Sequence, residues 1–308
     1  MAEKVSRLTK LMGNRFEFTV IAENKQEGNN AIDLAIAEVT RIENLLSTYK
    51  ANSQTNLIND NAGLRPVKVD DEVIDLIQRS IKISALTQGA FDITYGSIDK
   101  SLWNFDTNMT SLPDEETALL SVNLIDYENV AIYPANKTVM LKNKGMRIGF
   151  GGIGKGYAAD RAKQILKNAG IESGIVNAAG DLITWGKQLN GNNWTIGIAD
   201  PDQKMQPFSA LNISDMAIAT SGNYEKYATI KGIRYSHTID PKTGLPVGGI
   251  KSVSIICSSA ELADALATPV MVMGVEVGLD MINQLQNIAC IIIDENNRMF
   301  TSKNINIK

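Results

Sequence analysis

Cysteine is scarce in this sequence, with two residues in 308, and there is a single histidine. Cys257 lies in the apolar run VSIICSS and Cys290 lies in IACIII, so both are expected to be reduced residues of the core. We therefore expect no disulfide. This expectation fits a cytosolic chain and is also compatible with the cell envelope.

Excess positive charge and long hydrophobic runs are also missing. Lys and Arg number 30 against 34 Asp and Glu, a net charge of −4, and no stretch gathers the basic residues. This pattern argues against nucleic acid as a partner and favours a small substrate or another protein. No run reaches the roughly 18 apolar residues that a transmembrane helix needs, so no transmembrane segment is expected.

The beginning of the chain lacks the apolar centre of a signal peptide. The sequence as it stands is therefore expected to be cytoplasmic. A leader removed from a longer precursor would instead leave a cell-envelope lipoprotein, and the sequence leaves both locations open.

Linkers, internal repeats and low-complexity tracts are absent as well. The simplest organisation is a single domain over residues 1–308, with one lobe or two. Apolar spacing predicts an α+β fold, in which helices flank a mixed or antiparallel sheet. The predicted strands are 14–22, a short set within 128–150 around a turn at 134–137, 173–186, 194–200, 208–222, 251–259, 288–294 and 298–302. The predicted helices are 29–49, 70–89, 154–170 and 260–274.

Glycine is concentrated in RIGFGGIGKGYAAD, residues 147–160. Its glycines match the dinucleotide pattern G-x-G-x-x-G, and with Lys155 they also match the start of a P-loop. A P-loop needs Ser or Thr after the lysine, but Gly156 stands there. A Rossmann fold needs the motif at its first strand-to-helix turn, whereas two predicted helices precede it. Two interpretations remain: a tight packing turn, or a strand-to-helix junction that binds an anion through its backbone and Lys155.

The single histidine lies in YSHTIDPKTGLPV, residues 235–247. A lone histidine is more often structural than catalytic. The turn residues that follow it are expected to hold His237, Thr238 and Asp240 in a fixed array. A structural loop and a catalytic loop both remain open for this segment.

An acid lies in the otherwise apolar helical segment ELADALATPVMVMG. Asp264 and Thr268 are four residues apart, so they share one helical face. Pro269 cannot donate a helical hydrogen bond, which leaves the carbonyl of Ala265 without its usual donor. Such carboxylate, hydroxyl and carbonyl oxygens suit Mg²⁺ and do not suit zinc. The alternative is an aspartate that caps the helix or pairs with a lysine.

A series of motifs covers nearly the whole chain and resembles the ApbE family of flavin transferases. In chain order the motifs are LMGNRF, LLSTYK, GAFDITYG, GGIGKGYAAD, NAAGD, ATSGNY, HTIDPKTGLP and ADALAT. The resemblance implies the family's own α+β fold, Mg²⁺ as cofactor and FAD as donor substrate. It also implies an acceptor protein, a redox subunit that carries a Thr or Ser flavinylation site of the D-x-x-T-G-A-T type.

The resemblance further implies roles for individual residues. The metal is expected at the carbonyl of Gly152 and the side chains of Asp264 and Thr268, and His237 matches the histidine with a catalytic role. Because an acceptor hydroxyl needs a general base, we expect His237 to be that base and Asp240 to orient it. The residues expected to bind FAD are Met12, Tyr49, Ala90, Phe91, Asp92, Lys155, Asp181, Ser221 and Gly222, with Asn177, Gly180 and Thr220 in the same motifs.

One position departs from the family pattern. Many members carry an acid three residues before the metal-binding carbonyl, where this chain has Gly149. The loop is therefore expected to bind its ligand through its backbone.

The expected function is Mg²⁺-dependent transfer of FMN from FAD to a Thr or Ser hydroxyl of a target protein, with release of AMP. One alternative is an FAD pyrophosphatase, in which water replaces the acceptor and the products are FMN and AMP. The other is a flavin-binding protein without turnover. The presence of Asp264, Thr268 and His237 together favours an enzyme, because storage of a flavin needs neither a metal nor a base.

Overall fold

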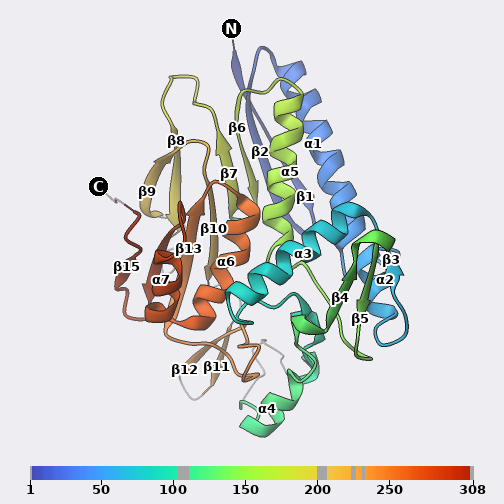
Figure 1. Ribbon diagram of the computed structural model, residues 1–308. Helices are drawn as coiled ribbons and strands as arrows, with labels where there is room; N and C mark the ends of the chain where they lie inside the picture. The colour runs from blue at the N-terminus through green and yellow to red at the C-terminus, as the bar shows by residue number, and fades with distance from the viewer. Residues whose placement is uncertain (1, 103–110, 200–206, 223–226, 231–232, 306–308) are drawn as a thin grey trace.

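An eight-stranded sheet forms the centre of the molecule (Figure 1). The computed structural model describes residues 2–102, 111–199, 207–222, 227–230 and 233–305. The strand order is β1-β2-β6-β7-β10-β13-β14-β15, and every neighbouring pair is antiparallel. The strands are β1 (Glu3–Leu11), β2 (Asn14–Ala22), β6 (Ser173–Ala178), β7 (Asp181–Trp185), β10 (Ala217–Gly222), β13 (Ile250–Cys257), β14 (Ala289–Asp294) and β15 (Met299–Thr301).

Helices cover one face of this sheet and a hairpin covers the other (Figure 1). The covering helices are α1 (Lys25–Leu46), α5 (Gly154–Asn168) and α6 (Ala260–Met273), followed by α7 (Val275–Asn283). The hairpin consists of β8 (Trp194–Ala199) and β9 (Pro207–Ile213). Its Trp194 packs with Leu182 and Ile218 in a small second core. The predicted α+β fold with antiparallel sheets is confirmed.

A second group of elements lies beside one end of the central sheet (Figure 1). Its elements are α2 (Gln54–Asp60), α3 (Asp71–Leu86), α4 (Glu115–Ser121), the sheet β3 (Val67–Lys68), β5 (Thr138–Leu141) and β4 (Val130–Tyr133), the hairpin β11 (Tyr227–Ile230) and β12 (Ile233–Ser236), and the 3₁₀ turns η1 (Ile93–Ser97), η2 (Lys100–Leu102), η3 (Tyr127–Asn129) and η4 (Pro134–Asn136). Ile58 and Val139 of this group belong to the same hydrophobic cluster as Phe16 of the central sheet. A single domain over residues 1–308 stays a prediction.

Helix α1 illustrates how local sequence sets an element and its buried face. The side chain of Asn24 accepts a hydrogen bond from the N–H of Glu27 at 2.9 Å, which caps the helix at its start. Ile32 and Val39 are fully buried against the sheet, as their helical spacing predicts. The helix begins four residues before the predicted 29–49 because Asn24 provides the cap.

Several elements of the structure were not predicted from the sequence. Strand β1 is an edge strand, and only Val5 and Leu11 of its nine residues are buried, so it carries little apolar alternation. Helices α2, α4 and α7 have seven to nine residues, which is too short for a clear helical period. The predicted strand 208–222 is two strands, β9 and β10. Asp200, at the end of a predicted strand, lies outside the described residues.

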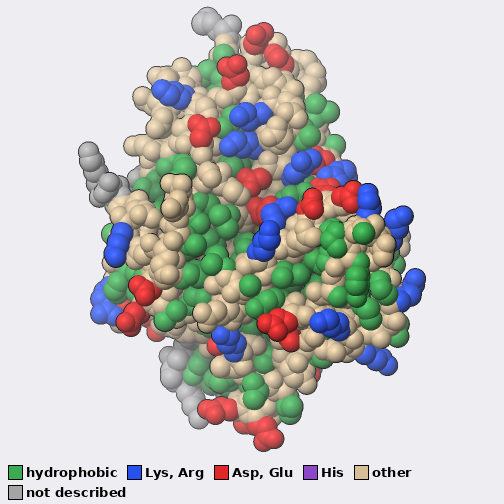
Figure 2. Space-filling model, in the orientation of Figure 1, with side chains coloured by type: hydrophobic (Ala, Val, Ile, Leu, Met, Phe, Trp, Pro, Cys, Tyr) green, Lys and Arg blue, Asp and Glu red, His purple; other side chains and the backbone are tan. Residues whose placement is uncertain are grey.

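Ion pairs connect the helices on the outer face, where Figure 2 shows acidic and basic side chains side by side. Arg41 of α1 pairs with Glu38 at 2.8 Å and with Glu72 of α3 at 2.7 Å. Arg79 of α3 pairs with Glu261 of α6 at 2.6 Å. Exposed pairs contribute roughly 0–1 kcal/mol each, so they fix how the helices lie against each other more than they add stability.

Both cysteines are buried thiols without a disulfide, as expected, and burial raises the pKa of Cys257 to about 11. Among the described residues, no helix combines the length and the apolarity needed to cross a bilayer.

Candidate active site

Polar groups from several distant segments line one cavity of about 220 Å³. The segments are the glycine segment 147–154, the first turn of α5, the start of β7, the end of β10, the residues after β12, and α6. The lining residues are Gly151, Gly152, Lys155, Asp181, Thr220, Ser221, Gly222, His237, Thr238, Asp264 and Thr268. Sequence positions more than 100 residues apart therefore meet at one place. Asn223 and Tyr224 of the predicted motif ATSGNY lie outside the described residues.

The glycine segment reaches the cavity as an irregular turn. Side chains and other loops hold its backbone: Asn59 accepts from the N–H of Ile148 at 2.7 Å, and the N–H of Gly149 donates to the carbonyl of Ile93 at 3.0 Å. Helix α5 begins at Gly154, so the predicted start of a helix is confirmed. The predicted strand just before the turn is wrong, because these backbone groups bond to side chains and loops and not to a neighbouring strand.

At Gly156 the backbones of α5 and α6 lie very close together. A Cβ atom on Gly156 would lie 2.1 Å from the carbonyl oxygen of Ala260 and 2.8 Å from the Cβ of Asp264. The N–H of Gly156 donates to Oδ2 of Asp264 at 2.9 Å. Residue 156 must therefore be glycine so that the helices can pack, which explains why the serine or threonine of a P-loop is absent.

We expect Gly156→Ala to lower the free energy of unfolding by about 3 kcal/mol or more, since overpacking against a rigid backbone costs about 1–3 kcal/mol and sometimes more. Denaturant unfolding at constant m-value measures this change. Gly151→Ala is the matched control, because a Cβ there would meet nothing within 4 Å. Equal stabilities of the two variants would contradict the close helix contact.

Asp160 joins the same two helices from the α5 side. Its carboxylate accepts hydrogen bonds from the hydroxyl of Ser259 at 2.8 Å and from the backbone N–H groups of Ala260 and Glu261 at 3.0 Å each. It therefore caps α6, the helix that carries Asp264. This role of Asp160 is not predictable from the sequence, because the partner of the capping group lies about 100 residues away.

Two buried acids and one lysine set the charge of the cavity. Lys155 Nζ forms an ion pair with Asp181 Oδ2. Burial, and then the negative charge of Asp181, raise the pKa of Asp264, while Lys155 and the backbone N–H groups of Gly156 and Lys155 act to lower it. These N–H groups belong to the N-terminus of α5, which was expected to bind an anionic ligand through its backbone. In the structure they donate to Asp264. Two carboxylates against one ammonium group favour a bound cation.

The oxygen donors in the cavity suit a hard cation. Asp264 supplies a carboxylate that is 7% exposed, and Thr268 supplies a hydroxyl one turn further along α6. The hydroxyl of Ser221 lies 3.0 Å from that of Thr268, and Gly152, whose carbonyl is the expected third ligand, also lines the cavity. Among the described residues, no group of three or more His, Cys, Asp or Glu side chains could hold a metal ion, so hydroxyl and carbonyl oxygens would have to complete a set of ligands here. The chemistry of these donors therefore fits Mg²⁺.

His237 lies on the cavity, directly after β12. Asp240 does not belong to the residues that line the cavity. Its Oδ1 accepts from the N–H of Lys242 at 2.9 Å, and its carbonyl accepts from the N–H of Gly244 at 2.9 Å. Asp240 thus stabilises the rigid turn that was expected after His237, and its role in orienting His237 stays a prediction.

The turn between β6 and β7 places Asp181. Asn177 Oδ1 accepts from the N–H of Gly180 at 2.8 Å, and Ala179 and Gly180 both have positive φ, 57° and 103°. On the next strand, the hydroxyl of Thr220 lies 2.8 Å from that of Ser254. The implied site residues Asn177, Gly180 and Thr220 therefore support the backbone around the cavity.

Other residues expected to bind FAD lie along the glycine segment. The ring of Phe91 packs on Gly152, where a Cβ would lie 3.4 Å from Phe91 Cε2. A Cβ on Gly154 would lie 3.7 Å from Met12 Cε. Ala90, next to Phe91, is buried, whereas the Tyr49 side chain is 95% exposed. None of the four is among the residues that line the cavity, and their contacts with a flavin stay predictions.

Asp92 uses its carboxylate to build the neighbouring turn. Its Oδ1 accepts from the N–H of Thr94 at 2.8 Å and from the Thr94 hydroxyl at 2.6 Å, and its Oδ2 accepts from the N–H of Tyr127 at 3.1 Å. Burial raises the pKa of Asp92, and these hydrogen bonds lower it. Asp92 is therefore a structural residue of η1, whose contact with FAD stays a prediction.

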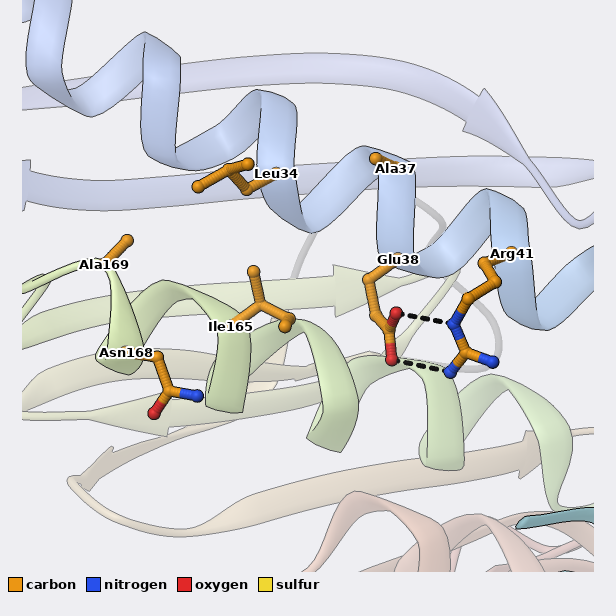
Figure 3. A pocket seen from close by; sticks show the side chains of 7 residues that line it. All are labelled: Leu34, Ala37, Glu38, Arg41, Ile165, Asn168 and Ala169. Atoms are coloured by element: carbon orange, nitrogen blue, oxygen red, sulfur yellow. Dashed lines mark hydrogen bonds and ion pairs between the residues drawn. The ribbon is translucent and has the colours of Figure 1, made fainter. Parts of the chain in front are cut away.

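A larger cavity of about 400 Å³ lies between α1 and α5, away from these residues (Figure 3). Its lining is mainly apolar, with Leu34 and Ile165 facing each other across it. Its only charged lining residues, Glu38 and Arg41, pair with each other at 2.8 Å. The smaller polar cavity is therefore the better candidate for an active site.

Comparison with other proteins shows the family of this chain. Residues 12–292 match the ApbE family, and the chain belongs to this family, as predicted. It is 31% identical over 266 residues to an FAD:protein FMN transferase of Klebsiella pneumoniae (strain 342), covering 86% of this chain and 82% of that protein.

Solved structures show the same fold. The crystal structure of the ApbE protein from Thermotoga maritima is similar with a TM-score of 0.87 at 30% identity, covering 98% of this chain and 97% of the other. The apo flavinyl transferase ApbE of Pseudomonas stutzeri gives a TM-score of 0.85 at 25% identity, with coverages of 98% and 95%. The predicted fold of the ApbE type is confirmed.

Proposed function

We propose that this chain is an FAD:protein FMN transferase that uses Mg²⁺, modifies a Thr or Ser hydroxyl of an acceptor protein and releases AMP. The observation that carries the proposal is the meeting of Gly152, Lys155, His237, Asp264 and Thr268 at one cavity in a chain of the ApbE family. The names of the relatives, FAD:protein FMN transferase and flavinyl transferase, support the transfer of a flavin.

Different residues of the cavity have different roles in the proposed phosphoryl transfer. Asp264, Thr268 and the carbonyl of Gly152 are the groups that would hold Mg²⁺, which supplies positive charge to neutralise the pyrophosphate of FAD. Lys155 adds a positive charge of the chain's own, held in place by Asp181. Fixed charges of this kind stabilise the charge that gathers on the phosphates in the transition state.

The acceptor supplies the nucleophile. Its hydroxyl oxygen forms a bond to the phosphorus on the riboflavin side, the bond between that phosphorus and the bridging oxygen breaks, and AMP leaves with this oxygen. A hydroxyl is a weak nucleophile at neutral pH, so its proton must go to a base. His237 is the base in this proposal, because it lines the cavity and an imidazole nitrogen can accept the proton of a hydroxyl.

The proposal is tested by separating the products of FAD by chromatography, with and without Mg²⁺ and with and without an acceptor of the D-x-x-T-G-A-T type. We expect AMP to appear in an amount that matches the flavin lost to the acceptor. AMP and free FMN in equal amounts, whether or not the acceptor is present, would show a pyrophosphatase instead. Bound FAD without any product would show a flavin-binding protein.

A further inference from the structure

Helix α2 carries two buried amide side chains that bond to the start of the glycine segment and to the loop around Tyr49. Asn56 and Asn59 are three residues apart on α2, so they lie on one face, and they are only 7% and 5% exposed. Buried amides are costly unless they are hydrogen-bonded, so the partners of these side chains show what α2 holds in place.

Asn56 binds the loop that carries Tyr49. Its Nδ2 donates to the carbonyl of Thr48 at 2.9 Å and to the carbonyl of Lys50 at 3.0 Å. Its Oδ1 accepts from Nη2 of Arg147 at 3.1 Å, at the start of the glycine segment. One side chain thus joins both residues that flank Tyr49 to the segment that leads to Gly152.

Asn59 fixes the glycine segment itself. Its Nδ2 donates to the carbonyl of Ile148 at 3.0 Å, and its Oδ1 accepts from the N–H of Ile148 at 2.7 Å. The pair of bonds replaces the strand partner that this segment lacks. Asn59 therefore fixes the glycine segment at Ile148. Asn56 links the neighbouring Arg147 to the Tyr49 loop.

The Tyr49 loop lies directly against the glycine segment. A Cβ on Gly149 would lie 3.9 Å from Cγ2 of Thr48. Glu43 ties the same loop to the β1–β2 turn, because its Oε2 accepts from the N–H of Met12 at 2.9 Å and its Oε1 lies 3.5 Å from Lys50 Nζ. Tyr49 itself is 95% exposed, so its ring makes little contact that would fix the loop.

From these contacts we infer that Asn56 is a positioning residue that holds the Tyr49 loop against the glycine segment and thereby sets the affinity for FAD. The inference rests on the proposed function and deepens it. Asn56 touches neither substrate nor metal in this account, so its loss weakens FAD binding and leaves the chemical step unchanged.

Asn56→Asp is the test variant, because it keeps the shape and the acceptor for Arg147 while it removes both donors to the loop. Asn61→Asp is the matched control at the C-cap of the same helix. Asn61 Nδ2 donates to the carbonyl of Leu57 at 2.9 Å, and its Oδ1 accepts from Nε of Arg65 at 2.9 Å. Like Asn56, it therefore bonds to a backbone carbonyl and to an arginine, but neither partner belongs to the Tyr49 loop. Asn56→Ala is the second variant if the aspartate variant does not fold.

Two measurements on each full-length variant test the inference. Native-state trypsin cleavage after Lys50, followed by mass spectrometry, is expected to be about tenfold faster in Asn56→Asp, since two hydrogen bonds of the loop are lost. The KM for FAD is expected to rise about tenfold, with kcat within a factor of two. Asn61→Asp is expected to match the wild type in both.

Unchanged cleavage after Lys50 in both Asn56 variants would overturn the inference, since the loop would then be held by other groups. Faster cleavage with an unchanged KM would also overturn it, because the loop would not contribute to FAD binding. A fall in kcat at constant KM would show a role in the chemical step instead. A wild type without any turnover of FAD would overturn the proposed function. The outcomes above concern the variants and overturn only the inference about Asn56, so the two failures are distinguishable.

Discussion

Replacing His237 by alanine is expected to lower the rate of FMN transfer by about 10²–10⁴-fold, which is the usual contribution of a general base. FAD binding is expected to stay close to that of the wild type, because the charged groups at the phosphates, Lys155 and Asp181, remain paired. The measurement is a single-turnover rate with saturating FAD and acceptor, together with a separate titration of FAD.

The variant His237→Gln separates the loss of the base from the loss of volume, since glutamine fills the space but accepts no proton at neutral pH. It is expected to be as slow as His237→Ala. A glutamine variant with near wild-type rate would contradict the base assignment. Loss of FAD binding in both variants, with no separate defect in rate, would make His237 a binding residue.

Replacing Asp264 by asparagine is expected to reduce Mg²⁺-dependent transfer by at least about 100-fold, because a metal ligand loses its charge. The thermal stability without Mg²⁺ is expected to stay equal or to rise. Burial and Asp181 already disfavour the ionised form of Asp264, so removal of this charge relieves a cost, and the amide oxygen still accepts from Gly156.

Asp280→Asn is the control, since Asp280 is exposed on α7 and is not among the residues that line the cavity. It is expected to leave both the rate and the stability unchanged. A clear drop in the stability of Asp264→Asn without Mg²⁺ would show that Asp264 mainly holds α5 and α6 together. Full activity of that variant would remove it from the metal site.

The elements with strong apolar periodicity were predictable from the sequence. Helix α1 and strand β2 bury one regular face, and the spacing of Ile32 and Val39 or of Phe16 and Phe18 shows this face directly. The edge strand β1 was not predictable, because its side chains are mostly exposed and its partner, not its own pattern, keeps it extended.

The site was predictable as a set of residue types and not as a set of contacts. The spacing of Asp264 and Thr268 gave one face of α6, and the family resemblance supplied the other cavity residues. Three kinds of contact were not predictable, because each depends on segments that only the fold brings together. They are the ion pair of Lys155 with Asp181, the hydrogen bonds of Asp240 and Asp92 within turns, and the hydrogen bonds from Asn56 to the Tyr49 loop.

Mass spectrometry of an acceptor peptide of the D-x-x-T-G-A-T type, after incubation with this protein and FAD, tests the central claim most directly. The account predicts a peptide heavier by one FMN, only when Mg²⁺ is present, with the modification on a Thr or Ser residue. An unmodified peptide in a reaction that has consumed FAD and released AMP would contradict it.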